Sequence, residues 1–314
     1  MNQLVFKEEA AKRKRRKQIK REIAATTLVL PVVLGFAFFG IFPMIVSFVV
    51  SLMDLRSYNV SLATWTGISN YIGIFKEIAN GGWVQTSLKN TLIYCLRVPI
   101  NLTVAVVLAN IISKKLRGNK FMRVILFLPQ VVSGVAITLM WKWVFEDNFG
   151  MINTTLSSIG LDKIPWLTEK HWFMVAVFII SLWQTGTNVL ILESAFLNVD
   201  KSLQEAARID GATEKQVFWH ITFPALTPSI FYLLTMWLIA ALQEQTVMQI
   251  IAANGTGPND SALTVTYYIY MMAFMYPASH GFGRACALSW VYALIIMVVT
   301  RLNFWFSKYW VKYD

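Results

Sequence analysis

Six residues with hydrogen-bonding or ring-stacking side chains lie within otherwise apolar stretches of the 314-residue chain: Gln184, Asn188, Gln243, Glu244, Trp183 and Arg97. Amides and carboxylates offer several donors and acceptors to the hydroxyls of a sugar, and an aromatic face suits a sugar ring. Because unpaired polar groups are costly among apolar residues, these six are candidates for a substrate path, with Trp237 as a further stacking candidate. The alternative is that the amides bond helices together and the aromatic rings only pack.

Two pairs among these candidates carry geometric predictions. Gln184 and Asn188 are spaced i, i+4, which predicts that both lie on one face of a single helix. Arg97 and Glu244 lie in different apolar stretches, and straight helices would place them within about 5 Å of the same depth. We therefore expect Arg97 and Glu244 to form an ion pair or to face one water-filled cavity. A lower-ranked alternative is that Arg97 neutralises an acidic or phosphorylated ligand.

Catalytic and metal-binding patterns are missing from the sequence. The G-x-x-x-x-G-K-[ST] loop that holds ATP phosphates does not occur, so energy from ATP has to come from a partner. His171, His220 and His280 lie in three segments without the spacing of metal ligands, and Cys95 and Cys286 imply no disulfide framework. The sequence thus predicts a non-enzymatic chain that binds no cofactor or metal of its own.

Composition places the chain in a lipid bilayer. Hydrophobic residues make up 56% of it and charged residues 14%, well below the roughly 25% of a soluble domain. Six apolar stretches each provide about the ~20 residues that cross a hydrocarbon core. They lie near residues 26–51, 87–112, 122–145, 172–197, 229–251 and 285–307. The predicted fold is all-α, a polytopic membrane protein with six transmembrane helices.

The basic residues predict the orientation. The run Lys12–Lys17 could bind nucleic acid or anchor the chain on the cytoplasmic side, and it stops just before the first span. This position favours the positive-inside interpretation over nucleic-acid binding, and basic residues between spans two and three lie on the same side. Both termini are then cytoplasmic. The first apolar run is too long for a cleavable signal peptide.

Residues 261–283 are uncharged and long enough to form a seventh span, but Pro277, Gly281 and Gly283 interrupt them. A seventh span would also move the basic C-terminal end to the outside. We expect an outer-face helix that partly re-enters the protein and is shielded from lipid, as irregular backbone must be.

Residues 205–228 form a charged, helix-prone insert between two apolar runs. Ser202 with Glu205, and Thr213 with Gln216, fit two capping boxes, each starting a short helix. Asp210-Gly211 predicts a turn between these helices, with a positive φ at the glycine. Pro224 and Pro228 are expected to end the second helix before the next apolar run.

The same insert resembles the EAA loop of bacterial ABC-importer permeases. The matching residues are Glu205, Ala206, Ala207, Asp210, Gly211, Ala212, Phe218, Ile221, Pro224 and Pro228. Further stretches resemble the carbohydrate-uptake branch of type I permeases, notably residues 121–129, 141–145, 150–153, 164–167 and 281–290. Two departures weaken the substrate assignment: Thr256 replaces a glycine of a Gly-Gly-Pro, and Ser194-Ala195-Phe196 replaces Ala-Gly-Leu.

The resemblance implies a type I permease fold, divided into a basic cytoplasmic tail (residues 1–24), a first transmembrane helix with an outer loop (25–86) and a core permease domain (87–310). The EAA segment, residues 198–228, is then cytoplasmic and couples to ATPases through the matched residues Glu205 to Pro224. Implied partners are a second homologous permease, two ATP-binding subunits that hold ATP and Mg²⁺, and an extracytoplasmic solute-binding protein. A sugar or oligosaccharide is the expected cargo, with a polyamine, phosphate or amino acid as the alternative.

Overall fold

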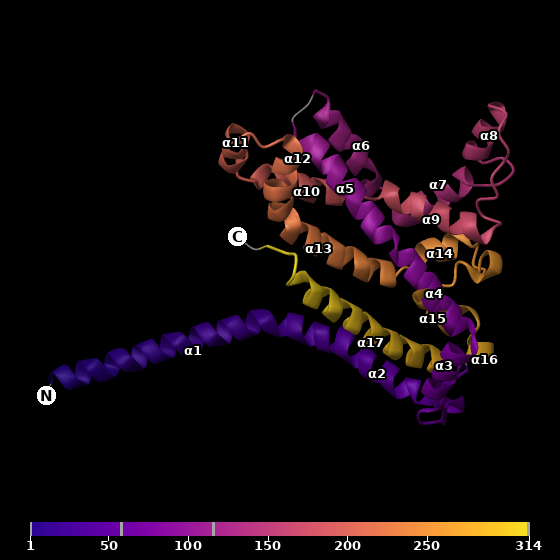
Figure 1. Cartoon of the computed structure of the whole chain (residues 1–314). Helices are drawn as coiled ribbons and strands as arrows, with labels where there is room; N and C mark the ends of the chain where they lie inside the picture. The colour runs from indigo at the N-terminus through magenta and orange to yellow at the C-terminus, as the bar shows by residue number, and fades with distance from the viewer. Residues whose placement is uncertain (1, 57–58, 115–116, 313–314) are drawn as a thin grey trace.

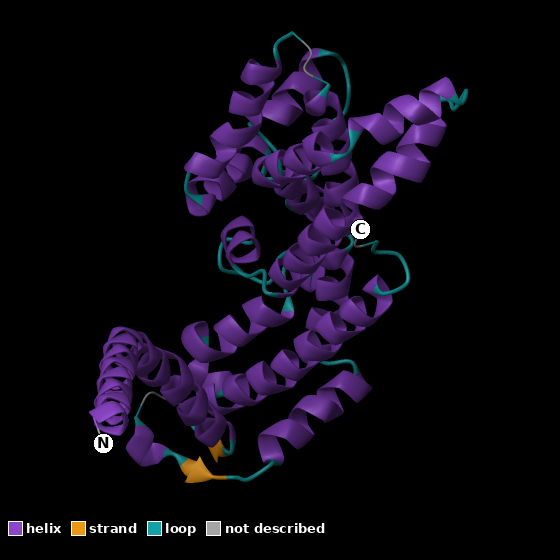
Figure 2. Cartoon of the chain, turned by 90° about the vertical axis from the view of Figure 1, so that its left-hand side faces the viewer, coloured by secondary structure: helices purple, strands orange, loops and turns teal. Residues whose placement is uncertain are grey.

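The computed structural model describes residues 2–56, 59–114 and 117–312, and most of them are helical (Figures 1 and 2). In chain order the α-helices are α1 (Asn2–Phe36), α2 (Phe42–Ser51), α3 (Ser69–Asn80), α4 (Trp83–Cys95), α5 (Arg97–Ser113), α6 (Asn119–Val131), α7 (Gly134–Val144), α8 (Met151–Ser158), α9 (Lys170–Trp183), α10 (Gly186–Asn198), α11 (Lys201–Ile209), α12 (Glu214–Val217), α13 (Phe223–Leu242), α14 (Thr246–Ile251), α15 (Val265–Tyr270), α16 (Pro277–His280) and α17 (Phe282–Ser307). Strands β1 (Met53–Asp54) and β2 (Thr64–Trp65) pair antiparallel after the first span.

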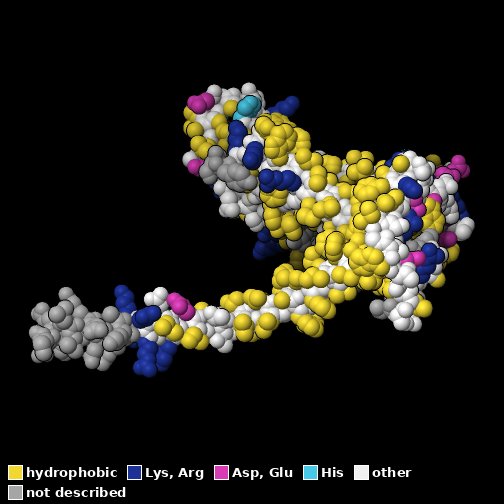
Figure 3. All heavy atoms as spheres, turned by 90° about the horizontal axis from the view of Figure 1, so that it is seen from below, with side chains coloured by type: hydrophobic (Ala, Val, Ile, Leu, Met, Phe, Trp, Pro, Cys, Tyr) yellow, Lys and Arg dark blue, Asp and Glu magenta, His cyan; other side chains and the backbone are white. Residues whose placement is uncertain are grey.

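Within the described residues, four helices are long and apolar enough to cross a membrane: Lys14–Ser51, Trp83–Ser113, Glu214–Leu242 and Phe282–Ser307. Two bent pairs, α6 with α7 and α9 with α10, complete the six predicted spans if each pair counts as one. The predicted bounds of span five are wrong, because its helix ends at Leu242 and not at residue 251. Charged side chains gather toward the ends of the molecule, with a hydrophobic surface between them (Figure 3).

Spans three and four are broken near their middles. The axes of α6 and α7 differ by 102°, and the chain between them turns at Val132, which is extended, and Ser133. The axes of α9 and α10 differ by 51° around Gln184 and Thr185. Gly186 allows α10 to begin against α6, because a Cβ built there would lie 1.8 Å from the Leu126 carbonyl oxygen.

Three π-helical turns each precede an aromatic–proline pair. They are η1 (Ala37–Ile41) before Phe42-Pro43, η3 (Phe218–Thr222) before Phe223-Pro224, and η5 (Met271–Met275) before Tyr276-Pro277. In each case the aromatic residue donates its amide to the carbonyl five residues earlier. A proline inside a helix has no donor, and its ring clashes with the preceding turn, so the wider turn lets the helix reach the proline.

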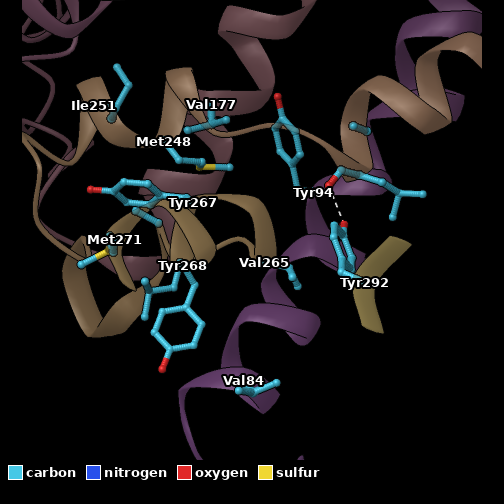
Figure 4. Close-up of a cluster of buried hydrophobic side chains, with 14 of the residues drawn as sticks. Val84, Tyr94, Val177, Met248, Ile251, Val265, Tyr267, Tyr268, Met271 and Tyr292 are labelled. Atoms are coloured by element: carbon cyan, nitrogen blue, oxygen red, sulfur yellow. Dashed lines mark hydrogen bonds between the residues drawn. The ribbon is translucent and has the colours of Figure 1, made fainter. Parts of the chain in front are cut away.

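The buried apolar residues form two separate clusters. The EAA-side core contains Ala105, Ala109, Ile112, Val189, Leu192, Phe196, Val199, Leu226, Ile230 and Leu233. The far core is larger and includes the buried tyrosines Tyr94, Tyr267, Tyr268 and Tyr292, several of which are drawn in Figure 4. Trp237 is half-buried and packs against both clusters, so the indole proposed for sugar stacking lies where the two cores meet.

Residues 261–275 are folded into the far core. Ser261 to Val265, Tyr267, Tyr268, Met271 and Met272 are buried, and the helical run Val265–Met275 is too short to cross a bilayer at 1.5 Å per residue. This agrees with the predicted short helix inside the protein.

The first span packs along the last one. In α2 and α17, the Trp290 indole donates to the Ser47 hydroxyl at 3.2 Å, and the rings of Phe48 and Trp290 lie 5.4 Å apart. Beyond this contact α1 extends away from the bundle (Figure 1). Figure 1 also shows both chain ends and α11 toward one side of the bundle, with α3, α8 and α16 at the other.

Candidate functional site

The EAA segment begins with an aspartate cap. The Asp200 carboxylate accepts from the Ser202 amide at 2.8 Å, and α11 starts at Lys201. Hydrogen bonds from Ser202 lower the pKa of Asp200 below its usual value. The predicted Ser202–Glu205 capping box is therefore wrong: Asp200, two residues earlier, occupies the cap and Ser202 lies inside the helix.

The turn after α11 has the geometry that Asp210-Gly211 predicts. Gly211 has a φ of +85°, its amide donates to the Arg208 carbonyl at 3.1 Å, and the Ala212 amide donates to the Ala207 carbonyl at 2.9 Å. These two bonds form a Schellman motif, which ends a helix with a left-handed residue. The motif fixes the angle between α11 and α12.

The second short helix has the predicted capping box. The Thr213 amide donates to the Gln216 side chain at 2.8 Å, and the Gln216 amide donates to the Thr213 hydroxyl at 3.4 Å. The local sequence thus correctly predicts both the Asp210-Gly211 turn and the Thr213–Gln216 capping box that follows it.

Contrary to prediction, Pro224 and Pro228 do not end this helix. α12, the π turn and α13 form one continuous helix from Glu214 to Leu242. The π turn accommodates Pro224, and the Thr227 hydroxyl donates at 2.7 Å to the Pro224 carbonyl, which lacks an amide partner because residue 228 is proline. α12 is therefore continuous with the helix of span five.

Side-chain bonds hold α11 to this continuous helix. Arg208 pairs with Glu214 through two contacts, 2.6 and 3.2 Å long, and Arg208 lowers the pKa of the Glu214 carboxyl. Gln204 also bonds the Thr222 hydroxyl at 3.3 Å. Phe218 is half-buried, and its ring lies 5.3 Å from the Trp219 ring and 6.2 Å from the Phe223 ring. The segment is thus built as one unit with the beginning of span five.

Two opposite faces of α11 differ in character. Lys201, Gln204 and Arg208 line a cleft toward the membrane helices. On the opposite face Leu203 is 57% exposed and Ala206 is also exposed. Between the two faces, Ile209 is 86% exposed and Glu205 and Asp210 are exposed. An exposed apolar surface that is rimmed by charges is typical of a protein-interaction site.

The bend in span four separates two of the predicted path residues. Gln184 ends α9 and Asn188 belongs to α10, so the prediction of one shared helical face is wrong. The Gln130 side chain donates at 2.7 Å to the Gln184 carbonyl and so joins the broken regions of spans three and four. Both Gln184 and Asn188 are half-buried.

Trp183 lies beside the break in span three. Its ring meets the Trp141 ring edge-on at 5.6 Å, and it lines a cavity of about 160 Å³ whose other walls are aliphatic residues, Met140 and Pro129. The indole is 46% exposed. This cavity offers packing and no convergent hydrogen-bonding groups; sugar stacking on the exposed part of Trp183 stays a prediction.

Arg97 and Glu244 are connected through Tyr94. The Arg97 guanidinium lies 4.4 Å from the Tyr94 ring centre, and the Tyr94 hydroxyl donates to the Glu244 carboxylate at 3.4 Å. Among the described residues, the ion pairs within 4.0 Å do not include Arg97, and its Nε is buried without a partner. The expected direct pair is thus replaced by a cation–π contact, because the buried Tyr94 ring lies beside the guanidinium and its hydroxyl reaches the carboxylate.

Span five ends in irregular backbone that side chains satisfy. Gln243 is an exposed residue that caps α13, and the Glu244 carboxylate accepts from the Val247 amide at 3.1 Å at the start of α14. The Leu242 carbonyl accepts from the Thr266 and Tyr292 hydroxyls, and the Glu244 carbonyl accepts from the Thr264 hydroxyl (Figure 4 shows Tyr292). Gln243 and Glu244 were predicted to lie within the helix of span five, and this is wrong because both follow the end of α13 at Leu242.

Several polar residues that belong to the membrane region were not selected from the sequence. Tyr94 and Gln130 are described above; Asn101 bonds the Ser181 hydroxyl at 3.1 Å, and Arg123 forms an ion pair with the buried Glu193. The rule that selected Gln184 and Asn188, a polar side chain within an apolar span, also selects Asn101, Gln130 and Glu193.

Comparisons with known proteins agree with this architecture. A protein-family model described as "Binding-protein-dependent transport system inner membrane component" matches residues 101–312. The chain is 35% identical to the "Probable ABC transporter permease protein YesP" of Bacillus subtilis, covering 97% of this chain and 96% of that one. It is 31% identical to the "Lactose transport system permease protein LacF" of Rhizobium radiobacter, covering 93% and 97% of the two chains.

Among solved structures, a chain of a bacterial ABC transporter "involved in the import of the acidic polysaccharide alginate" superposes with a TM-score of 0.76. That alignment covers 94% of this chain and 99% of the other, at 22% identity, and so establishes a shared fold. The family model covers about two thirds of the chain, including the EAA segment and the broken spans. The chain therefore belongs to the family of inner-membrane components of binding-protein-dependent transport systems and is a multi-pass permease subunit.

Proposed function

We propose that this chain forms half of the membrane path of an ATP-driven importer that takes up a sugar or oligosaccharide. A second, homologous permease completes the path, two ATP-binding subunits bind ATP and Mg²⁺ and dock on the EAA segments, and an extracytoplasmic protein delivers the cargo. Relatives named for lactose and for multiple sugars support a carbohydrate over a polyamine, phosphate or amino acid.

The observation that carries the coupling role is the construction of the EAA segment. Its exposed apolar face offers a docking surface, while the Schellman turn, the Arg208–Glu214 pair and the continuous helix connect that surface to span five. Closure of the docked ATPases then rotates span five, and the path alternates between its two openings. Glu205, Ala206 and Ala207 contact the ATPase, Asp210, Gly211 and Ala212 set the angle, and Phe218 and Pro224 transmit the movement.

The cytoplasmic side is the side of the EAA segment in this proposal. Both chain ends lie toward that side of the bundle, and the exposed basic residues from Lys14 to Arg21 precede the first apolar stretch. Basic residues next to a span favour the cytoplasmic side. The breaks in spans three, four and five lie between the two ends and supply the irregular, polar backbone that membrane transport sites use.

The test is a matched pair of charge substitutions in the complex purified with its partner subunits. Leu203→Glu places a carboxylate in the proposed docking face, where Leu203 is 57% exposed. Leu161→Glu is the control, because Leu161 is 56% exposed but follows α8, at the opposite end of the bundle from α11 (Figure 1). We expect Leu203→Glu to lose ATPase subunits on co-purification and to reduce ATP-dependent sugar uptake at least ~10-fold. Substitution of a residue at the centre of an interface commonly weakens binding by that much. Equal ATPase retention and uptake by both variants would contradict the docking role.

A further inference from the structure

A cleft of about 510 Å³ lies between the EAA segment and the ends of two spans. α11 and α12 form one side, and the ends of α5 and α10 form the other, at Ser113, Lys114 and Phe196. A volume of this size is in the range of small-molecule sites. The cleft is therefore positioned at the membrane–water interface, beside the element that couples to the ATPases.

The cleft is strongly cationic. Among the described residues that line it, four are basic and one, Glu214, is acidic; the basic residues are Lys114, Lys201, Lys215 and Arg208. Arg208 and Glu214 are paired with each other, whereas the three lysines form no ion pair within 4.0 Å with any residue that the structure describes. With four basic side chains and one acidic one, the described lining of the cleft carries a net charge of +3, which favours an anionic ligand.

The walls of the cleft combine these charges with apolar and amide groups. Phe196, Val199 and Phe218 border the EAA-side core, and Asn110 and Gln204 supply hydrogen-bond donors. Free phosphate needs no apolar wall, but a phospholipid presents a phosphate next to its acyl chains. Basic pockets between membrane helices on the cytoplasmic side are typical headgroup sites.

Occupation of the cleft is compatible with ATPase docking. Lys201, Gln204 and Arg208 face the cleft at i, i+3 and i+7, while Leu203 and Ala206 lie on the opposite, exposed face of α11. A ligand in the cleft and a protein on that exposed face therefore contact different sides of one helix.

We propose that this cleft binds the headgroup of an anionic phospholipid such as phosphatidylglycerol. The phosphodiester lies among Lys114, Lys201 and Lys215, and an acyl chain runs along Phe196 toward the bilayer. Because these lysines come from α5, α11 and α12, the bound lipid links the EAA segment to span two. The surrounding lipid thereby adjusts how easily the segment moves, independently of which solute the permease carries.

The experiment measures lipid retention by native mass spectrometry on the full chain, with phosphatidylglycerol and phosphatidylcholine as the probes. We expect selective retention of phosphatidylglycerol and an affinity loss of about 5-fold per lysine, so on the order of 100-fold for Lys114→Gln/Lys201→Gln/Lys215→Gln. Lys114→Arg/Lys201→Arg/Lys215→Arg keeps the charge and should retain the lipid, which separates loss of the site from loss of the fold. The proposal would be overturned if the unmodified chain retained both lipids equally. It would also be overturned if the glutamine variant retained as much phosphatidylglycerol as the unmodified chain.

A second basic groove provides the matched control. It has a volume of about 490 Å³, and it is lined along α17 by Arg301, Lys308 and aromatic residues. Arg301→Gln/Lys308→Gln removes interfacial charge outside the cleft and should leave phosphatidylglycerol retention within 2-fold of the unmodified chain. Competition by glycerol phosphate at an affinity equal to the lipid's would show a site for free phosphate esters and would refute the lipid assignment.

Discussion

The two cores of this permease are built from different chemistry. All ten residues of the EAA-side core are Ala, Val, Ile, Leu or Phe, which pack without directional bonds. The far core contains four buried tyrosines, and the hydroxyls of Tyr94, Tyr267 and Tyr292 bond Glu244, Gly255 and Leu242 respectively. A smooth apolar interface tolerates small sliding and rotation, whereas hydrogen bonds between specific groups fix one geometry.

This contrast corresponds to a division of tasks. The EAA-side core lies next to the segment that moves with the ATPases in the proposed function, and its ten buried residues interact by close packing. The far core surrounds the irregular backbone after span five, where each unpaired carbonyl is costly. Substitutions that change packing volume should therefore matter most in the EAA-side core, and substitutions that remove a hydrogen bond should be felt in the far core.

The largest effect is expected where close packing brings α6 and α10 together. Gly186→Ala places a Cβ 1.8 Å from the Leu126 carbonyl oxygen, so α10 has to separate from α6. We expect a loss of about 3 kcal/mol or more in the free energy of unfolding, which thermal unfolding in detergent would register as a large drop in Tm. Gly134→Ala is the control, because a Cβ there has nothing within 4 Å; similar Tm values for the two variants would refute the packing argument.

An intermediate effect is expected at the turn of the EAA segment. Gly211 has a positive φ and open space around it, so Gly211→Val is disfavoured by conformation and not by a clash. The cost is about 1–2 kcal/mol, and the larger consequence is a changed angle between α11 and α12. We expect ATP hydrolysis to persist with reduced uptake, while Gly211→Asn, which tolerates this conformation, keeps most of the coupling. Equal coupling in both variants would show that the angle is unimportant.

The smallest effect is expected from a single hydroxyl in the far core. Tyr292→Phe removes a donor to the Leu242 carbonyl, which keeps the Thr266 hydroxyl as a second partner. Such bonds in membrane proteins contribute about 0.6–1 kcal/mol, so a small but measurable fall in Tm is expected. Tyr232→Phe, at a tyrosine that is 54% exposed, should leave Tm unchanged. An unchanged Tm in Tyr292→Phe would show that the tyrosine hydrogen bond does not stabilise the far core, contrary to the proposed difference between the two cores.

Local signals in the sequence were sufficient for the approximate positions of the spans, the Asp210-Gly211 turn and the Thr213 cap, because each depends on neighbouring residues. The breaks in spans three and four were not predictable by hydropathy, since Val132 is itself apolar and the polar residues Gln184 and Thr185 leave their long stretch apolar on average. Pro224 indicated a helix end, but the π turn before it lets the helix continue through the proline.

The contacts of the substrate-path candidates were also not predictable from local sequence. The predicted direct pair of Arg97 and Glu244 was wrong, because straight helices could not anticipate Tyr94 between the two residues or the break after Leu242. Gln184 and Asn188 were assigned to one face for the same reason. Contacts between helices decide these features, and a single sequence does not contain them explicitly.

The central claim is that the EAA segment drives span five through one continuous helix. Trp219→Gly/His220→Gly weakens that helix at two exposed positions, and Met297→Gly/Val298→Gly weakens α17 equally at two exposed positions, by about 1 kcal/mol per residue in each case. The decisive measurement is sugar uptake and ATP hydrolysis in the same proteoliposomes of the assembled complex. We predict that the first variant hydrolyses ATP but transports at least ~10-fold less sugar per ATP, while the second keeps the normal ratio. A normal ratio in the first variant would contradict the account.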